Sequence, residues 1–280
     1  QTTRLTWFDR SGKSLGAITD PGGYHEPSLS PDDKKVIFGR GEGVGTQDIF
    51  LMDLVRGNST RLTFVAAADT SSLFSPDGSQ IVFSSNRAGQ FDVYRRASSG
   101  AGNDELLMNG SSGRPYADSW SRDGKYLLYE KNGTVKTKID LWVLPMLGDP
   151  TPFPYLQGAF VESHAQFSPD GRWVAYVSDE SGRAEVFVQS FPVSGGKWQI
   201  STAGGDQPQW RGDGKELFYI APDRNLMAVT VSGGSTFEAG RPTVLFQTAV
   251  PLTGIADDRN NYVPTQDGQR FLVNNLANMT

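Results

Sequence analysis

The 280-residue sequence contains no cysteine. Disulfide bonds, thiolate catalysis and cysteine-ligated zinc are therefore excluded, while the compartment stays open because cytosolic and periplasmic proteins can both lack cysteine. Histidine is nearly as scarce, since only His25 and His164 occur. Three histidines cannot meet at one metal ion, and we predict neither a metal nor another cofactor.

Clustered positive charge and long apolar runs are also missing. The chain has 26 Lys and Arg against 31 Asp and Glu, a net charge of −5, which argues against nucleic acid as a partner. No run of 18 apolar residues occurs, so we expect no membrane contact by this domain itself. The sequence is already strand-like from Arg4, without a charged and then apolar leader. The sequence is therefore either a complete soluble protein or a soluble domain of a longer chain, which could itself be membrane-anchored, and its strand-like start favours the second.

Familiar catalytic motifs are absent as well. The sequence has no Gly-x-Ser-x-Gly elbow, no His-Glu-x-x-His pair and no calcium loop of the EF-hand type. We therefore predict no catalytic residue and a domain that is not itself an enzyme.

What the sequence does have is a repeat, clearest at Phe74-Ser75-Pro76-Asp77-Gly78. Related segments place an aspartate at six positions, which are 45, 46, 47, 43 and 54 residues apart: Asp32, Asp77, Asp123, Asp170, Asp213 and Asp267. Pro-Asp-Gly is typical of a tight turn, because proline presets φ and glycine accepts positive φ. A period in the forties with strand–turn–strand units indicates the blades of a β-propeller.

The register of the repeat extends beyond the turn. Positions four, five and six after the aspartate are apolar in every copy, as in Ile81-Val82-Phe83, which predicts a strand buried on both faces. A third strand follows, usually beginning with an acid such as Asp48 or Glu185, which we expect to bind local backbone or an arginine. The outermost strands are predicted around 60–64, 105–108, 151–153, 197–200 and 244–246.

The sixth copy has only two strands before the chain ends, and residues 4–19 match the missing two. We therefore predict an all-β, six-bladed propeller of four-stranded antiparallel blades, closed by N-terminal strands that complete the last blade. The single domain spans residues 1–280, with blades at about 24–65, 70–108, 116–157, 162–202, 206–247, and 260–276 plus 4–19.

Two levels of resemblance follow from these motifs. Ser-Pro-Asp-Gly followed by an apolar strand, then Ser85-Asn86-Arg87-Ala88-Gly89 and Asp92-Val93-Tyr94, resembles the repeat of TolB-like (WD-like) propellers. Segments such as Leu5-Thr6-Trp7-Phe8-Asp9 and Gly171-Arg172-Trp173-Val174-Ala175-Tyr176 resemble the C-terminal propeller of bacterial eukaryotic-like serine/threonine kinases. That resemblance implies an extracytoplasmic sensor or binding domain, although this sequence has none of the kinase motifs.

Candidate binding residues lie at the starts of the innermost strands, which line the central channel of a propeller at one mouth. Positions six before the repeat aspartates form a mostly polar ring there. We predict a ligand site from His25, Glu26, Ser71, Asp118, His164, Gln207 and Asn261. A partner-binding rim is predicted beside it from Tyr24, Tyr116, Phe160, Asp257, Asp258 and Arg259, the last three in the long connection 247–260.

Three functions remain open on this sequence. The favoured hypothesis is a non-catalytic module that binds a protein, a peptide or a small molecule at the channel mouth. One alternative is a hydrolase or lyase that uses His164, His25 and Glu26 at that mouth. The other is a structural spacer with a solvent-filled channel.

Overall fold

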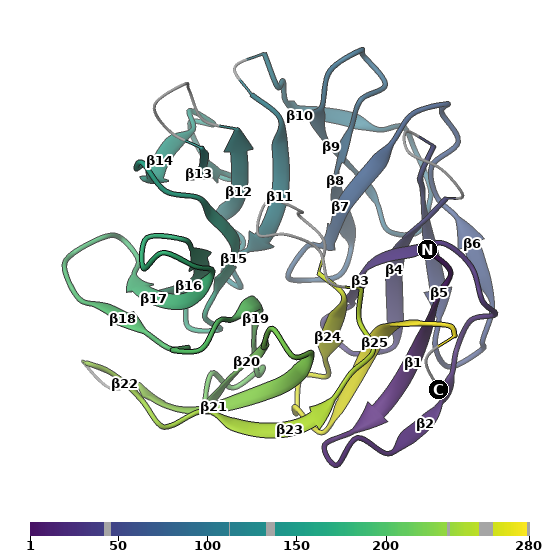
Figure 1. Ribbon diagram of the computed structural model, residues 1–280. Helices are drawn as coiled ribbons and strands as arrows, with labels where there is room; N and C mark the ends of the chain where they lie inside the picture. The colour runs from purple at the N-terminus through teal and green to yellow at the C-terminus, as the bar shows by residue number, and fades with distance from the viewer. Residues whose placement is uncertain (42–45, 112, 133–137, 234–235, 252–259, 279–280) are drawn as a thin grey trace.

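The computed structural model describes residues 1–41, 46–111, 113–132, 138–233, 236–251 and 260–278. This part of the chain contains 25 strands and no helix, and hence no helix long and apolar enough to cross a membrane. The strands form six antiparallel sheets arranged around a central axis (Figure 1). The predicted all-β, six-bladed propeller is confirmed.

Five of the six blades take their strands consecutively from the chain. Blade 1 contains β3 (Tyr24–Leu29), β4 (Lys35–Arg40), β5 (Asp48–Asp53) and β6 (Ser59–Arg61), and blade 2 contains β7 (Asp69–Phe74), β8 (Gln80–Ser85), β9 (Asp92–Ala97) and β10 (Glu105–Met108). Blade 3 contains β11 (Pro115–Trp120), β12 (Tyr126–Asn132), β13 (Ile139–Pro145) and β14 (Phe153–Leu156). Blade 4 contains β15 (Glu162–Phe167), β16 (Trp173–Ser178), β17 (Glu185–Ser190) and β18 (Lys197–Gln199). Blade 5 contains β19 (Asp206–Trp210), β20 (Glu216–Ile220), β21 (Asn225–Gly233), β22 (Phe237–Ala239) and β23 (Thr243–Gln247).

The sixth blade joins the two ends of the chain, as predicted. Its inner strands are β24 (Tyr262–Pro264) and β25 (Arg270–Leu276), and its outer strands are β1 (Thr3–Asp9) and β2 (Ser14–Ala17). Strand β1 pairs with β25 from Thr3↔Leu276 to Asp9↔Arg270, and Figure 1 shows the N-terminal and C-terminal strands side by side. This pairing closes the ring, because β1 and β25 satisfy edges of each other that would otherwise lack hydrogen-bond partners.

The repeat turn has the same internal bonds in five blades. In blade 2, the Ser75 hydroxyl donates to Asp77, and the backbone N–H of Ser79 donates to the same carboxylate oxygen at 3.0 Å. Ser75 Oγ in turn accepts the N–H of Gln80, which begins the next strand. These bonds, the one from Ser75 foremost, lower the pKa of Asp77 to about 2. The aspartate is thus a turn-forming residue, and its recurrence reflects the fold.

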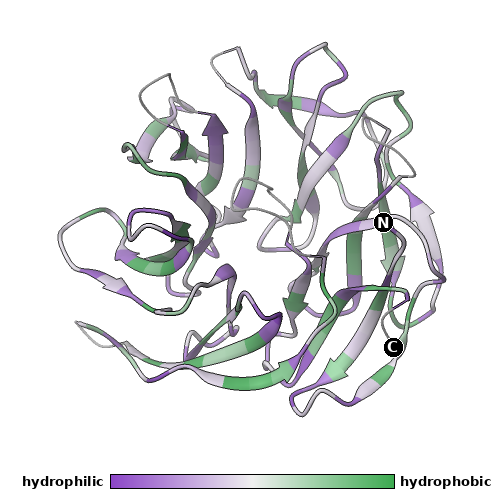
Figure 2. Ribbon diagram, viewed as in Figure 1, coloured by the Kyte–Doolittle hydropathy of each residue, from purple (hydrophilic) through white to green (hydrophobic). Residues whose placement is uncertain are grey.

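The hydrophobic core lies between the blades. The apolar triplets of the six second strands are buried in every copy, as Ile81, Val82 and Phe83 show, each with no exposed surface. Six clusters of buried side chains follow, one for each pair of neighbouring blades. Hydrophobic residues run along the strands of the blades in Figure 2. Burial of both faces explains why these strands are continuously apolar.

Three outer strands differ from the sequence prediction. In blade 1 the last strand, β6, ends at Arg61 and not near residue 64. In blade 3 the last strand begins at Phe153, because Asp149 accepts the N–H and hydroxyl of Thr151 and holds that residue in a turn. In blade 5, β21 continues to Gly233 and its far half pairs with the additional strand β22. Phe237 of β22 is buried against Trp173 and Trp198, which accounts for the extra hairpin.

Candidate functional site

A β-bulge marks the start of the innermost strand in five blades. In β3, His25 pairs with Gly39 but Ser28 pairs with Ile37, so one extra residue is inserted. Equivalent shifts occur in β7, β11, β15 and β19. At four of these bulges the residue six before the repeat aspartate has positive φ: Glu26 (53°), Ser71 (51°), His164 (52°) and Gln207 (55°). We call this end of the channel the bulge mouth.

The left-handed backbone of Ser71 is held by a side chain from the preceding blade. Glu26 accepts the backbone N–H of Ser71 at 2.6 Å and the hydroxyl of Thr70 at 2.9 Å. Non-glycine residues at positive φ cost on the order of 1–3 kcal/mol each, and this bond helps to offset that cost at Ser71. Between blades 5 and 6, Gln207 Oε1 likewise accepts the N–H of Asn261 at 2.7 Å.

His164 is fixed in the same way. Its backbone N–H donates to Glu130 of blade 3, and its Nδ1 lies 3.0 Å from the Asp206 carboxylate of blade 5. Its side chain has essentially no exposed surface. The structure therefore places the histidine between three blades and not on the open surface of the mouth.

Polar ties of this kind cross every boundary between neighbouring blades. Besides the bonds of Glu26, Glu130, Asp206 and Gln207, the Ser84 hydroxyl donates to Pro115 O at 2.8 Å between blades 2 and 3. Between blades 6 and 1, Asn274 Nδ2 donates to Tyr24 O at 2.8 Å. Much of the polar ring predicted from the sequence thus holds adjacent blades in register.

The seven predicted ligand residues are not brought together on one surface. Glu26, Ser71 and Asp118 line the central channel. Gln207 lines a separate cavity of about 270 Å³ between blades 4 and 5. The remaining three, His25, His164 and Asn261, line neither cavity.

The predicted partner-binding rim is also divided. Tyr24 is buried and packs edge-on against Phe38, with Arg40 over its ring at 5.7 Å. Tyr116 packs against Phe91, and Phe160 is 42% exposed. Three further rim residues lie outside the described residues: Asp257, Asp258 and Arg259.

The central channel has a volume of about 260 Å³ and reaches the opposite face, where the repeat turns lie. The residue just before each repeat aspartate lines it there, and we call this ring the turn mouth. It consists of Pro31, Pro76, Arg122, Pro169, Gly212 and Gln266. Three blades keep the proline of the repeat and three depart from it.

The three residues that replace proline, Arg122, Gly212 and Gln266, hydrogen-bond to one another across the channel. Arg122 of blade 3 donates from Nη1 to Gly212 O at 3.0 Å and from Nη2 to Gln266 Oε1 at 3.1 Å. Gly212 N also donates to Gln266 O at 2.9 Å. A side chain at Gly212 would place its Cβ 2.6 Å from the backbone oxygen of Gln266, so this close approach requires glycine.

Sequence reasoning missed this ring, although a signal was present. The six repeats were aligned on their aspartates, and the preceding position reads Pro, Pro, Arg, Pro, Gly and Gln. The alignment thus shows an arginine, Arg122, at a position that lines the channel in the structure. The turn signature alone does not reveal that the residue before each aspartate faces the channel, which only the closed ring shows.

The carboxyl of Glu162, near the bulge mouth, has a pKa above its usual value. Glu162 begins β15 and is 6% exposed. Burial, together with the nearby charge of Asp140, raises the pKa of Glu162 to about 7. Within the described residues no group of three or more His, Asp or Glu side chains is arranged to hold a metal ion.

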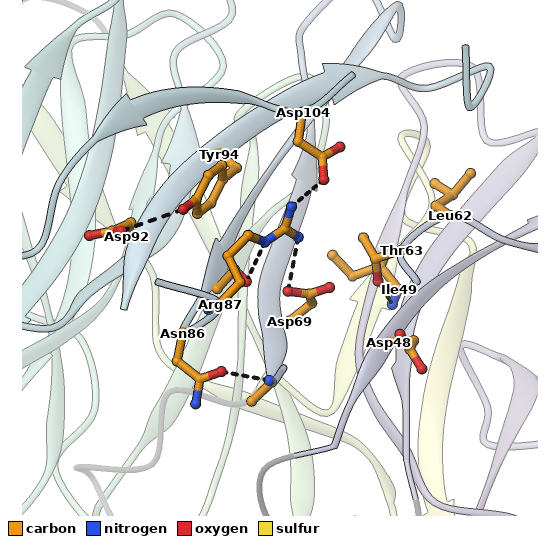
Figure 3. A network of polar contacts seen from close by, with 12 residues as sticks. Asp48, Ile49, Leu62, Thr63, Asp69, Asn86, Arg87, Asp92, Tyr94 and Asp104 are labelled. Atoms are coloured by element: carbon orange, nitrogen blue, oxygen red, sulfur yellow. Dashed lines mark hydrogen bonds and ion pairs between the residues drawn. The ribbon is translucent and has the colours of Figure 1, made fainter. Parts of the chain in front are cut away.

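The Ser-Asn-Arg segment of the repeat also has a structural role. Arg87 donates to Asp69 and Asp104 and stacks over Tyr94, with its guanidinium 4.5 Å from the ring centroid (Figure 3). Asn86 accepts the N–H of Ala68 at 2.8 Å. This network joins the strands of blade 2 on their buried side, and its residues line neither the channel nor the cavity between blades 4 and 5.

Comparison with known proteins agrees with this architecture. Residues 11–146 match the model of the TolB beta propeller domain. Over this stretch, which is 136 of the 280 residues, the chain is similar to TolB propellers.

Solved structures of several kinds share the fold. A putative TolB from Agrobacterium tumefaciens superimposes with a TM-score of 0.76 at 18% identity, covering 98% of this chain and 99% of that one. TolB from Acinetobacter baumannii gives 0.67 at 17% identity, covering 87% and 66%. An oligogalacturonate lyase from Vibrio parahaemolyticus gives 0.62 at 10% identity, covering 100% and 99%. At these identities the likeness concerns the fold, which is shared by enzymes and other proteins alike.

Proposed function

We propose that this chain is a non-catalytic binding propeller whose ligand, a protein segment, a peptide or a small molecule, enters the central channel. The observation that carries the proposal is the channel itself, which is lined by different side chains in each blade and held by a rigid ring. Asp118 contributes a carboxylate at the bulge mouth, and Arg122 and Gln266 contribute polar groups at the turn mouth. Rigid scaffolds that present unlike residues at one opening are suited to recognition.

The proposed compartment and parent protein rest on the resemblance of sequence motifs to a known family. We place the domain outside the cytoplasm and, as part of the same proposal, in a serine/threonine kinase-like protein that senses or binds a ligand there. The similarity to TolB structures supports the propeller part of this assignment. Sequencing the parent gene upstream of Gln1 tests the kinase part, since a kinase domain followed by a membrane helix is expected there.

Site-specific cross-linking tests the binding role. A photoreactive amino acid at Tyr116, beside the bulge mouth, should capture a defined partner in cells, whereas the same group at Phe153, on an outer strand, should not. The purified partner should then bind the unmodified domain, and Asp118→Asn should weaken binding at least tenfold without changing thermal stability. Equal capture from both positions, or full binding by the Asp118 variant, would contradict the proposal.

A lyase remains the second candidate, because one solved neighbour of matching length is an oligogalacturonate lyase. Incubating the domain with oligogalacturonides and following the unsaturated product by ultraviolet absorbance separates the two functions. The binding proposal predicts no product above background.

A further inference from the structure

The turn mouth carries a cation, Arg122, whose two hydrogen-bond acceptors are neutral. Arg122 is exposed, and its guanidinium donates to Gly212 O and Gln266 Oε1. Within the described residues it makes no ion pair, whereas Arg10, Arg87 and Arg172 each pair with a carboxylate. A guanidinium bonds a planar carboxylate more strongly than it bonds amide oxygens.

The surroundings concentrate hydrogen-bond donors at this one point. Pro31, Pro76 and Pro169 offer no backbone N–H on the rim, and Gly212 N and Gln266 N are already bonded, to Gln266 O and Asp33. Gln266 uses its amide oxygen for Arg122, which leaves its amide nitrogen as a second donor beside the guanidinium. A carboxylate that displaces the two acceptors, Gly212 O and Gln266 Oε1, from Arg122 would accept from the guanidinium and from this amide nitrogen.

Negative charges on the same face belong to the turns. Asp123, the next residue, accepts the Ser121 hydroxyl at 2.7 Å and pairs with Lys125 at 3.1 Å. Asp33 accepts the N–H of Gln266. Asp123 is thus bonded within its own turn and Asp33 to the turn of blade 6, and neither lines the channel, whereas Arg122 does.

We infer that the turn mouth is a binding site for a carboxylate group, such as the C-terminus of a peptide that occupies the channel. The carboxylate replaces the hydrogen bond between Arg122 and Gln266 and accepts from both side chains. The three prolines of the turn mouth surround it with conformationally restricted backbone. The inference rests on the proposed function in that the ligand occupies the channel. It adds the chemical class of the group recognised and assigns it to the mouth opposite Glu26 and Asp118.

Binding of acetyl-glycyl-glycine, compared with its C-terminal amide, tests the site. The indole N–H signals of Trp120 and Trp210, which line the channel, report binding by NMR titration. The unmodified protein should bind the carboxylate about 10–100-fold more tightly than the amide, the range expected for a charge-assisted hydrogen-bonded pair. Arg122→Ala should abolish this discrimination and Arg122→Lys should retain part of it. Arg172→Ala, which removes an arginine paired with Asp170, should leave it unchanged.

The outcomes separate this inference from the proposed function. Equal binding of acid and amide, no binding of either, or full discrimination by Arg122→Ala would overturn the carboxylate site. Loss of binding in Asp118→Asn with full discrimination in Arg122→Ala would keep the channel as the binding site and reject the turn mouth. A merely structural Arg122 would lower the melting temperature of the Ala variant without changing the ratio of the two affinities.

Discussion

The two mouths of the channel use their polar side chains in different ways. At the bulge mouth, Glu26, His164 and Gln207 are buried and bonded to a neighbouring blade. At the turn mouth, Arg122 is exposed and reaches across the channel to neutral acceptors in blades 5 and 6. The residue types alone suggest a ligand site at the bulge mouth, whereas the hydrogen-bond partners of these residues favour a ligand site at the turn mouth.

This difference shows that a ring of polar residues in a propeller can be a device for joining blades. A buried backbone N–H at a bulge needs an acceptor, and a carboxylate or amide from the preceding blade supplies it. The side chains are then committed to the fold. A residue is available for ligand recognition when its present partners can be exchanged at little cost.

The largest expected effect comes from removing the strands that close the ring on which both mouths depend. A variant lacking residues 1–19 loses the β1–β25 pairing and exposes the buried face of β25. We expect its melting temperature to fall by about 10 °C or more, measured by circular dichroism. An unchanged transition would show that the ring is held by the other five blades alone.

At the bulge mouth, Glu26→Ala should destabilise the fold strongly. It leaves the Ser71 N–H and the Thr70 hydroxyl without their acceptor, at a cost of about 3 kcal/mol. Glu26→Gln is the matched control, because it keeps an acceptor oxygen and should cost less than half as much. Urea denaturation measures both, and a neutral Glu26→Ala would remove the distinction between the mouths.

Glu162 gives the bulge-mouth region a pH dependence. The pKa of this carboxyl is 4.5 when free and about 7 in the folded protein, so the folded state binds its proton more tightly. This contribution to stability is therefore present below pH 4.5 and is lost as the pH rises to 7. Glu162→Gln cannot ionise, and relative to the unmodified protein it should gain about 3 kcal/mol between pH 4.5 and pH 8. Denaturation series at the two pH values test this, and parallel curves would contradict it.

The smallest effect on stability is expected at the turn mouth. Arg122→Ala removes two exposed hydrogen bonds and should cost at most about 1 kcal/mol. Arg87→Ala provides the contrast, since its guanidinium is largely buried between Asp69 and Asp104. Should Arg122→Ala destabilise as much as Glu26→Ala, the arginine would be a tie between blades like those of the bulge mouth.

The sequence predicted the blades and their closure because the repeat recurs in register. Apolar triplets such as Ile81-Val82-Phe83 and the match of residues 4–19 to two missing strands are patterns along the chain. The bulges could not be predicted in this way. A single inserted residue changes the pairing of His25 and Ser28 without altering the spacing of the repeat.

The candidate site was predicted in part. Glu26, Ser71 and Asp118 were correctly placed along the channel, but sequence cannot show that Glu26 is bonded to Ser71 or that His164 is enclosed by three blades. The alignment of the repeats shows Arg122 at a position where three other copies have proline, but it does not show what Arg122 contacts. Its partners come from 90 and 144 residues away, which only the closed ring brings together.

A crystal structure of the protein with acetyl-glycyl-glycine tests the central claim, that the two mouths have different roles, most directly. The account predicts the carboxylate at the turn mouth, hydrogen-bonded to Arg122 and Gln266, with the Arg122–Gly212 bond broken and the bonds of Glu26 and His164 unchanged. A carboxylate bound elsewhere, or a ligand that displaces Glu26 from Ser71 while Arg122 keeps its present partners, would contradict it.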